Sequence, residues 1–252
     1  MKISKTILIL FITILIVPIF SIVVLSFQDN DNERFRWYIE ILGNSSFLSS
    51  LGLSFLISSI VALLSTTISF LTALSWFNAK QRFLVFFVII IFGLLPPDIL
   101  ALSISKIPRF LGLYDLNLLF LCFGLLLYCL PFGVLIFWTR FYFIDDIILK
   151  SAKDIGFFNS SIIFKIIAPL SSMALVSCFM FSFLLSFNEY PRTYYLSGFY
   201  MLVSEFLNGK LSSGADQSIY AGGSLIILLT SISTVLLGVA YLISKRKTTM
   251  AE

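Results

Sequence analysis

Long apolar runs separated by shorter polar stretches dominate the chain. Each run is long enough for one α-helix to cross the hydrocarbon core of a bilayer, which takes about 20 residues. The pattern therefore predicts an all-helical (all-α) polytopic membrane protein that forms a single transmembrane domain over residues 1–252. The six predicted spans are 6–27, 47–77, 83–105, 116–137, 166–187 and 218–243.

The first run has the basic start of a signal peptide, but it is longer than a signal-peptide core. No A-x-A cleavage pattern follows it, so we expect an uncleaved first span. Within the other runs, Pro131 is expected to interrupt the fourth span. Four serines at helical spacing, Ser54, Ser58, Ser65 and Ser69, place small side chains on one face of the second span, which favours close packing of helices.

Composition supports the membrane assignment. The chain is 59% hydrophobic and only 12% charged, a balance that is too apolar for a soluble globular domain. Six spans place both termini on the same side of the membrane. Of the 17 Lys and Arg residues, eleven fall in the termini and loops of that side and six in the opposite loops. The excess of positive charge predicts that both termini and the loop 138–165 are cytoplasmic.

The loop 138–165 carries a distinctive pattern of its own. Asp145 and Asp146 can cap a short helix, whose apolar residues recur at helical spacing. Gly156 stands where a left-handed residue would end that helix, and a second helix is expected after Asn159-Ser160-Ser161. Such an element can fit a groove on a soluble partner. The alternative is an ordinary loop capped by Asp and Gly.

This loop resembles the cytoplasmic loop of binding-protein-dependent ABC importer permeases, whose pattern is E-A-A, three residues, G, nine residues, I-x-L-P. The matching residues are Ala152, Asp154, Gly156, Ile166 and Pro169, and the departures are Lys150 in place of Glu, Ser151 in place of the first Ala, and Ala168 in place of Leu. In that family the loop docks on an ATPase, so the resemblance implies that Lys150, Ser151, Ala152, Asp154, Gly156 and Pro169 couple this chain to one.

The resemblance extends from about residue 7 to residue 247. Further motifs resemble, in order and spacing, the second permease subunit of spermidine/putrescine importers: Pro18-Ile19-Phe20, Val24-Leu25-Ser26-Phe27, Arg36-Trp37-Tyr38, Pro97-Asp98-Ile99 and Cys129-Leu130-Pro131-Phe132. It implies a type I ABC importer permease fold in a bacterial inner membrane and transport of a small cationic solute, a polyamine. The implied partners are cytoplasmic ATP-binding subunits, a second homologous permease, an extracytoplasmic solute-binding protein and membrane lipid.

Few charges lie where a solute would cross. Asp98 is the carboxylate inside a predicted span, and Glu189 follows the fifth span between Asn188 and Tyr190. Ionisable groups at membrane depth usually face a pathway or a partner, and tyrosine rings can contact an ammonium group. Asp98 can instead cap a helix after Pro97, and Glu189 can be a solvated acid paired with Arg192. Polyamine permeases often carry an acidic pair here, and Asn188 replaces one acid.

Several residue types and motifs are absent from the sequence, and their absence reduces the number of possible function classes. It has no histidine, its three cysteines lie in apolar runs, and no G-x-x-x-x-G-K-[ST] motif occurs. We therefore expect no metal site, no cofactor and no catalytic activity, with ATP hydrolysis on a separate subunit. The net charge of +4 follows from topology and implies no nucleic-acid partner. The rival classes are an ion-coupled secondary transporter, an ABC permease for another small solute and an intramembrane aspartyl protease, whose second aspartate is missing.

Overall fold

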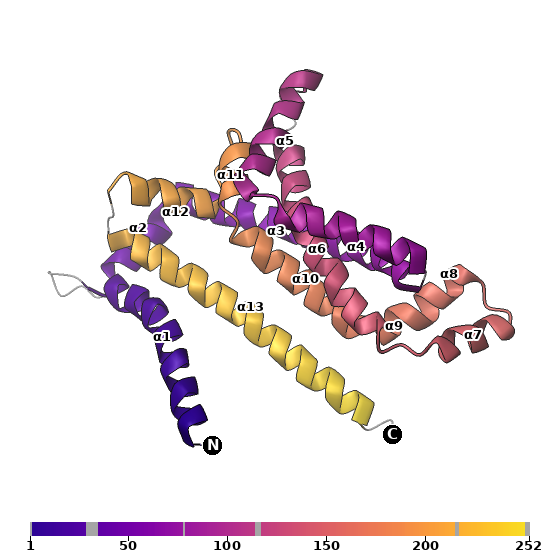
Figure 1. The fold of residues 1–252 in the computed structure, drawn as a ribbon. Helices are drawn as coiled ribbons and strands as arrows, with labels where there is room; N and C mark the ends of the chain where they lie inside the picture. Colours follow the sequence, from indigo (N-terminus) through magenta and orange to yellow (C-terminus); the bar gives the residue numbers. More distant parts are fainter. Residues whose placement is uncertain (1, 29–34, 78, 114–116, 215–216, 250–252) are drawn as a thin grey trace. The chain divides into compact units, whose positions relative to one another are not determined.

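The computed structural model describes residues 2–28, 35–77, 79–113, 117–214 and 217–249. Within these residues every regular element is a helix, which confirms the predicted all-α class (Figure 1). The helices are α1 (Lys2–Ser26), α2 (Arg36–Gly43), α3 (Ser45–Ala73), η1 (Leu74–Phe77), α4 (Ala79–Leu94), α5 (Pro97–Leu111), α6 (Asn117–Phe141), α7 (Asp146–Asp154), α8 (Asn159–Ile162), η2 (Ile163–Ile167), α9 (Ala168–Leu170), α10 (Ser172–Phe187), α11 (Pro191–Leu196), α12 (Val203–Ser212) and α13 (Gln217–Thr249).

Several of these helices are long and apolar enough to cross a membrane. Among the described residues, three such stretches are Ser45–Phe77, Asn117–Phe141 and Gln217–Leu236. A fourth arises if the bent pair Ser160–Leu170 and Ser172–Phe187 is one span, and Leu10–Ser26 is a shorter apolar helix. These stretches fall within or overlap five of the predicted spans, and the total of six stays a prediction.

The third predicted span, 83–105, is divided between α4 and α5 in the structure. The division falls at Leu95 and Pro96, directly before Pro97. Two consecutive prolines supply no backbone N–H, so the helix that approaches them cannot continue its hydrogen bonds, whereas proline suits the first position of the next helix.

The expected interruption at Pro131 is wrong. Helix α6 runs without a break from Asn117 to Phe141, with Pro131 inside it and buried. Proline is tolerated in membrane helices where neighbouring helices pack around the distorted turn. Here α10 packs along α6, and the thiol of Cys129 donates a hydrogen bond to the carbonyl of Ser182 at 3.6 Å.

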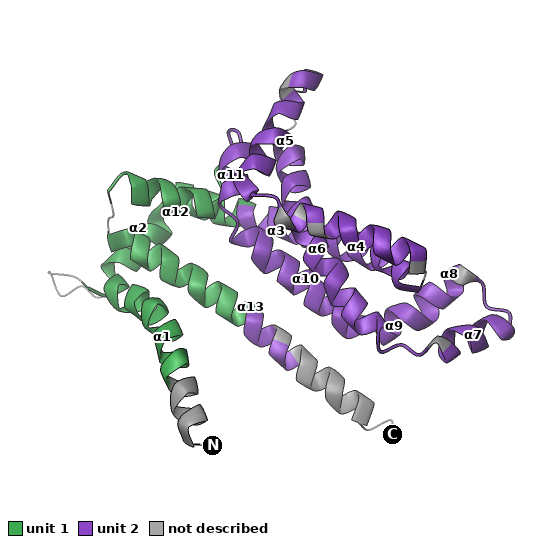
Figure 2. Ribbon diagram, in the orientation of Figure 1, with its two compact units in different colours: residues 1–53, 201–233 green, residues 54–200, 234–252 purple. Residues whose placement is uncertain are grey.

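The chain divides into two compact units (Figure 2). Unit 1 comprises residues 1–53 and 201–233, and unit 2 comprises residues 54–200 and 234–252. In unit 1 the hydroxyl of Tyr38 lies 2.7 Å from that of Ser26 and 2.7 Å from that of Ser224. The rings of Phe47 and Phe206 pack at 5.7 Å between centroids. These contacts join α1, α2, α3, α12 and α13 within the unit.

Unit 2 is built on α6, which packs against α4, α5, α10 and α11. The serine face of α3 is confirmed as a packing surface, since Ser54, Ser58, Ser65 and Ser69 are all completely buried. Ser65 Oγ shares a hydrogen bond of 3.1 Å with Ser182 Oγ of α10. Small side chains on α3 thus let neighbouring helices approach closely, as the sequence pattern predicted.

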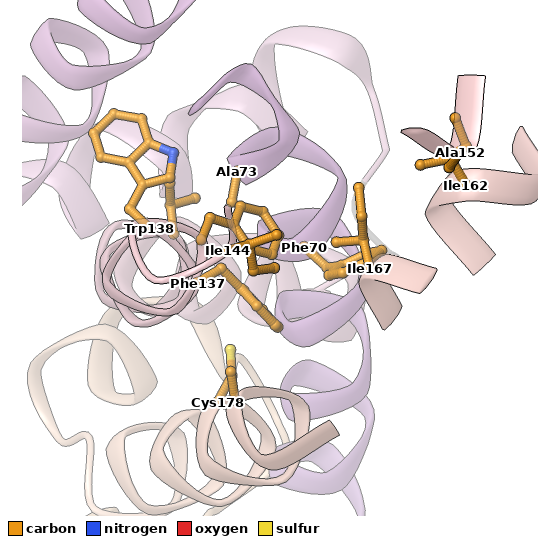
Figure 3. Packing of buried hydrophobic residues seen from close by; sticks show 12 residues of the cluster. Phe70, Ala73, Phe137, Trp138, Ile144, Ala152, Ile162, Ile167 and Cys178 are labelled. Atoms are coloured by element: carbon orange, nitrogen blue, oxygen red, sulfur yellow. The ribbon is translucent and has the colours of Figure 1, made fainter. Parts of the chain in front are cut away.

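Aromatic rings fill the end of unit 2 where α6 meets η1 and α7. Phe70 packs edge-on against Phe137 with 5.4 Å between ring centroids, and Phe77 stacks on Phe141 at 5.4 Å. The same apolar cluster extends through Ile144 to Ala152 and Ile162, which lie side by side in Figure 3. The loop after α6 is therefore anchored to the core of its unit.

Candidate functional site

The helix α7 forms where the sequence predicted it. Asp145 is its N-cap, and Asp145 Oδ1 accepts the backbone N–H of Ile147 at 3.0 Å. Lys150, Ser151 and Asp154 are exposed, whereas Ala152 is 6% exposed and packs in the cluster that contains Ile162. The small Ala152 thus holds α7 against α8, and the polar candidate residues remain available at the surface.

Gly156 makes the turn that ends α7, as predicted. Its φ is 91°, in the left-handed region that disfavours residues with a side chain. The Gly156 N–H donates to the Lys153 carbonyl at 2.9 Å, and the Phe157 N–H donates to the Ala152 carbonyl at 3.1 Å. These two bonds are the Schellman pattern, which satisfies the last carbonyls of the helix.

The returning helical segment begins at Asn159 and is irregular. After α8, the backbone widens into the π-helix η2, where the Ala168 N–H donates to the Ile163 carbonyl. Pro169 lacks an N–H and crowds the carbonyl of Lys165, four residues earlier, so an ordinary α-turn cannot continue there. The helix then breaks at Ser171, and the segments 160–170 and 172–187 meet at an angle of 74°. We call residues 167–172 the elbow.

Arg140 contacts the elbow from the last turn of α6. Its Nε and Nη2 both donate to the carbonyl oxygen of Leu170, at 2.9 and 2.6 Å. Leu170 is the last residue of α9, so its carbonyl lies at the negative end of a helical segment, where a cation is favourable. This role of Arg140 was not predicted from the sequence. The available signals were an Arg in a helix-ending position and a Pro shortly before a helix break.

The surface around α7 and α8 is apolar as well as charged. Ile155 is 77% exposed and Phe158 is 81% exposed. Ile147, Phe143 and Phe164 are also exposed. Aliphatic and aromatic side chains in such a group are typical of a surface that another protein covers. The α7–Gly156–α8 element is therefore both rigid at its turn and apolar on its outer side, which suits a docking element.

The other candidate residues lie on α5 and beside α11. Asp98 is exposed and is the second residue of α5. Asp98 therefore lies inside the first turn of α5, where the helix dipole favours a carboxylate. It is not the N-cap of the helix, because the N-cap position precedes Pro97. Asn188 uses its side-chain amide locally, donating to the Leu184 carbonyl at 2.9 Å.

Glu189 is not the solvated acid that one interpretation expected. It pairs with Arg192, as that interpretation proposed, but Glu189 is only 9% exposed and Arg192 only 3%. The Arg192 guanidinium also lies over the ring of Tyr128 of α6, 4.2 Å from its centroid. Tyr190 packs on Tyr194 with 5.7 Å between ring centroids. The burial of this ion pair and its contact with Tyr128 were not predicted, because Tyr128 lies 61 residues before Glu189 in the sequence.

Helix α6 connects the two groups of candidate residues. Helix α11 packs against α5 and α6, and α7 follows the other end of α6 (Figure 1). Tyr128 contacts Arg192, and Arg140 contacts Leu170. Tyr128 and Arg140 are twelve positions apart in one helix, a rise of about 18 Å. Helix α5, which carries Asp98, packs against α11, which follows Glu189, whereas α7 follows the C-terminal end of α6.

Comparisons with known proteins identify relatives of the whole chain. No family model matches it. It is 27% identical over 246 residues to the spermidine/putrescine transport system permease protein PotC of Escherichia coli K12, covering 93% of this chain and 90% of PotC. It is 25% identical over 233 residues to PotC of Haemophilus influenzae Rd, covering 88% and 90%.

One solved structure with the same fold is a chain of a bacterial ABC transporter that imports the acidic polysaccharide alginate. The two structures superpose with a TM-score of 0.73 at 15% sequence identity, over 97% of this chain and 95% of the other. A likeness at that identity shows the fold alone, because one fold carries many different solutes and activities.

Proposed function

We propose that this chain, which is a permease subunit of an ABC importer and a relative of PotC, moves a small cationic solute of the polyamine class, spermidine or putrescine, into the cytoplasm. The observation that carries the proposal is similarity to PotC along 93% of the chain. The fold does not choose the solute, since an importer of an acidic polysaccharide shares it.

The proposed partners follow from the importer class. A permease without a phosphate-binding loop needs separate cytoplasmic ATP-binding subunits. A second permease, homologous or identical, completes the pathway, and an extracytoplasmic binding protein delivers solute to the region 188–217. Both termini and the α7–α8 element lie in the cytoplasm of the proposed topology, which rests on the distribution of Lys and Arg.

The α7 element supports the assignment of a docking site. Its Schellman turn at Gly156 sets the direction in which α8 returns, and its exposed residues include Lys150, Ser151 and Asp154. The proposed sequence is alternating access: ATP closes the two ATPase subunits, α7 moves with them, and the spans reorient around the solute. The usual Glu is Lys150 here, so the matching ATPase groove should not present a cation at that point.

Asp98 is the proposed contact for the solute's ammonium groups, because its carboxylate is exposed in the first turn of α5. Tyr190 and Asn188 are further residues that we propose to line the pathway. Glu189 contributes as the partner of Arg192, and that pairing compensates its charge. In this proposal Asp98 is the one uncompensated carboxylate that this subunit contributes to the pathway. We therefore expect the second permease to contribute further acidic residues.

Uptake measurements test the solute class. Cells that lack their own polyamine importers, and that express this chain with its ATPase, second permease and binding protein, should accumulate radiolabelled spermidine or putrescine. Unlabelled polyamines should compete, and alginate oligosaccharides should not. Normal uptake of another solute with no competition by polyamines would contradict the polyamine assignment and leave the permease class intact.

A further inference from the structure

The elbow at residues 167–172 has irregular backbone hydrogen bonding. The π-helix before it replaces regular i→i−4 bonds, and Pro169 removes one donor altogether. At Ser171 the N–H is shared between the carbonyls of Ile167 and Ala168, at 2.9 and 3.1 Å. The helix direction changes there by 74°. Because Pro169 lacks a donor and the bond from Ala168 spans five residues, we expect this segment to bend more easily than a regular α-helix unless a contact from outside the helix fixes it.

A buried hydroxyl group in the elbow supports the same expectation. Ser171 is completely buried, and its Oγ has no hydrogen-bond partner among the residues that the structure describes. Buried hydroxyl groups are normally hydrogen-bonded. The side chain of Ser171 therefore adds no hydrogen bond that would fix the break, and fixing it would take a contact from another helix.

Arg140 supplies that contact. Two donors of one planar guanidinium meet the single carbonyl oxygen of Leu170, at 2.9 and 2.6 Å. Hydrogen bonds from a charged donor are stronger than neutral ones, and the rigid fork of Arg fixes direction as well as distance. Because Arg140 belongs to α6, the contact ties the elbow to the helix on which unit 2 is built.

We propose that Arg140 is a positioning residue for energy coupling: its guanidinium locks the elbow, so that movement of α7 and α8 is passed to α10 as a rigid body. This inference rests on the proposed function, in which the ATPase subunits move α7. The contact of Arg140 with Leu170 comes from the structure itself. Without the lock, the same movement of α7 bends the elbow instead of turning α10. The ATPase then hydrolyses ATP with little transport.

Three variants separate the lock from a simple charge. Arg140→Gln removes the charge and the fork. Arg140→Lys keeps the charge but offers a compact ammonium group in place of the planar fork. Thr139→Val is the matched control, because Thr139 is exposed and its hydroxyl donates within its own turn, to the Ile136 carbonyl at 2.7 Å.

Amide hydrogen exchange of the purified chain in lipid nanodiscs measures the lock directly and needs no partner protein. In Arg140→Gln, exchange across residues 163–175 should rise about tenfold, which corresponds to about 1.4 kcal/mol of lost protection. Exchange should rise less in Arg140→Lys and match the wild type in Thr139→Val. If cells do not produce the Arg140→Gln protein, the exchange comparison is made with Arg140→Lys instead. Unchanged exchange in both Arg140 variants overturns the lock.

The assembled transporter tests coupling. Arg140→Gln should retain its ATPase subunits on purification, while solute taken up per ATP hydrolysed falls about tenfold. Faster exchange with an unchanged ratio of uptake to hydrolysis would make Arg140 a structural cap only and overturn the proposal. Absence of any ATPase from the wild-type preparation would instead overturn the proposed function, and the exchange result would still report on the lock.

Discussion

The carboxylate of Glu189 and the guanidinium of Arg192 form a buried ion pair, and the Arg192 guanidinium also lies over the ring of Tyr128. The pair links the start of α11 to the middle of α6. Since each charge compensates the other, the cluster holds these two segments together without leaving a net charge. We expect the pair to stabilise the frame of the proposed pathway, in which Asp98 is the residue proposed to face the solute.

Breaking this pair should destabilise the protein more than removing it. Arg192→Gln leaves a buried carboxylate, and Glu189→Gln leaves a buried guanidinium, so each should cost about 3 kcal/mol or more. The double variant leaves neither charge and should recover much of that loss. Thermal unfolding in detergent and the level of inserted protein measure the effect. Single variants as stable as the wild type would show that the pair is not a structural link.

Gly156→Val tests the turn of the proposed docking element. A Cβ at Gly156 would meet nothing within 4 Å, so the cost is purely that of a φ of 91°. That conformation costs a residue with a side chain about 1 kcal/mol or more, and a β-branched residue the most. The variant should insert normally but lose ATPase association and uptake.

Gly156→Asn is the matched control for that prediction, because Asn adopts the left-handed region more readily than Val. It should retain most ATPase association when the complex is purified through this chain. Equal association of the wild type, the Val variant and the Asn variant would remove the turn from its docking role.

Gly133→Ala tests the close packing of α6 on α3. A Cβ at Gly133 would overlap the Ser69 hydroxyl and lie 2.8 Å from Ser69 Cβ. Overpacking of this kind costs about 1–3 kcal/mol. Gly93→Ala is the control, since nothing lies within 4 Å of its Cβ position. The melting temperature should fall in Gly133→Ala and stay level or rise slightly in Gly93→Ala, because alanine favours a helix. It should recover in part when Ser69→Gly is added, since Cys178 Sγ also lies 3.0 Å from the Gly133 Cβ position. No fall in Gly133→Ala would contradict the packing of these helices.

Sequence patterns predicted the fold well where a single local interaction determines the backbone structure. Asp145 and Gly156 mark the two ends of α7 because caps and left-handed residues act within one turn. The serine face of α3 followed from helical spacing alone. Pro131 was misjudged because its effect depends on whether α10 packs around it, which no local pattern encodes.

The candidate site was predicted only in part for a similar reason. The pairing of Glu189 with Arg192 follows from their i,i+3 spacing, whereas its burial depends on Tyr128 from a distant helix. The contact of Arg140 with Leu170 likewise joins residues 30 positions apart. Interactions across helices are set by tertiary packing, so their residues gave no periodic signal.

Accessibility of single cysteines tests the proposed topology. Ser160 and Ser213 are both exposed, at positions proposed to lie on opposite sides of the membrane. In intact cells, Ser160→Cys should be shielded from an impermeant thiol reagent, and Ser213→Cys should be labelled. Cys129 and Cys178 are buried, and the unmodified chain provides the background value. The reverse labelling pattern would overturn the orientation.

Asp98→Asn tests the proposed contact with the solute. The substitution keeps the size of the side chain and removes its charge, so uptake of spermidine should fall about tenfold for each 1.4 kcal/mol of lost attraction. Insertion and basal ATP hydrolysis should survive, and Asp98→Glu should retain part of the uptake. Initial rates of uptake over a range of spermidine concentrations provide the measurement. Normal uptake by Asp98→Asn would remove Asp98 from the pathway.

The source of energy is the most direct test of the account. The chain is purified with its ATP-binding subunits and second permease and reconstituted in proteoliposomes with binding protein and labelled spermidine outside. With no ion gradient and with ionophores present, ATP inside the vesicles should drive accumulation, and a non-hydrolysable analogue should not. Accumulation that requires an ion gradient and ignores ATP would contradict the assignment and identify an ion-coupled transporter.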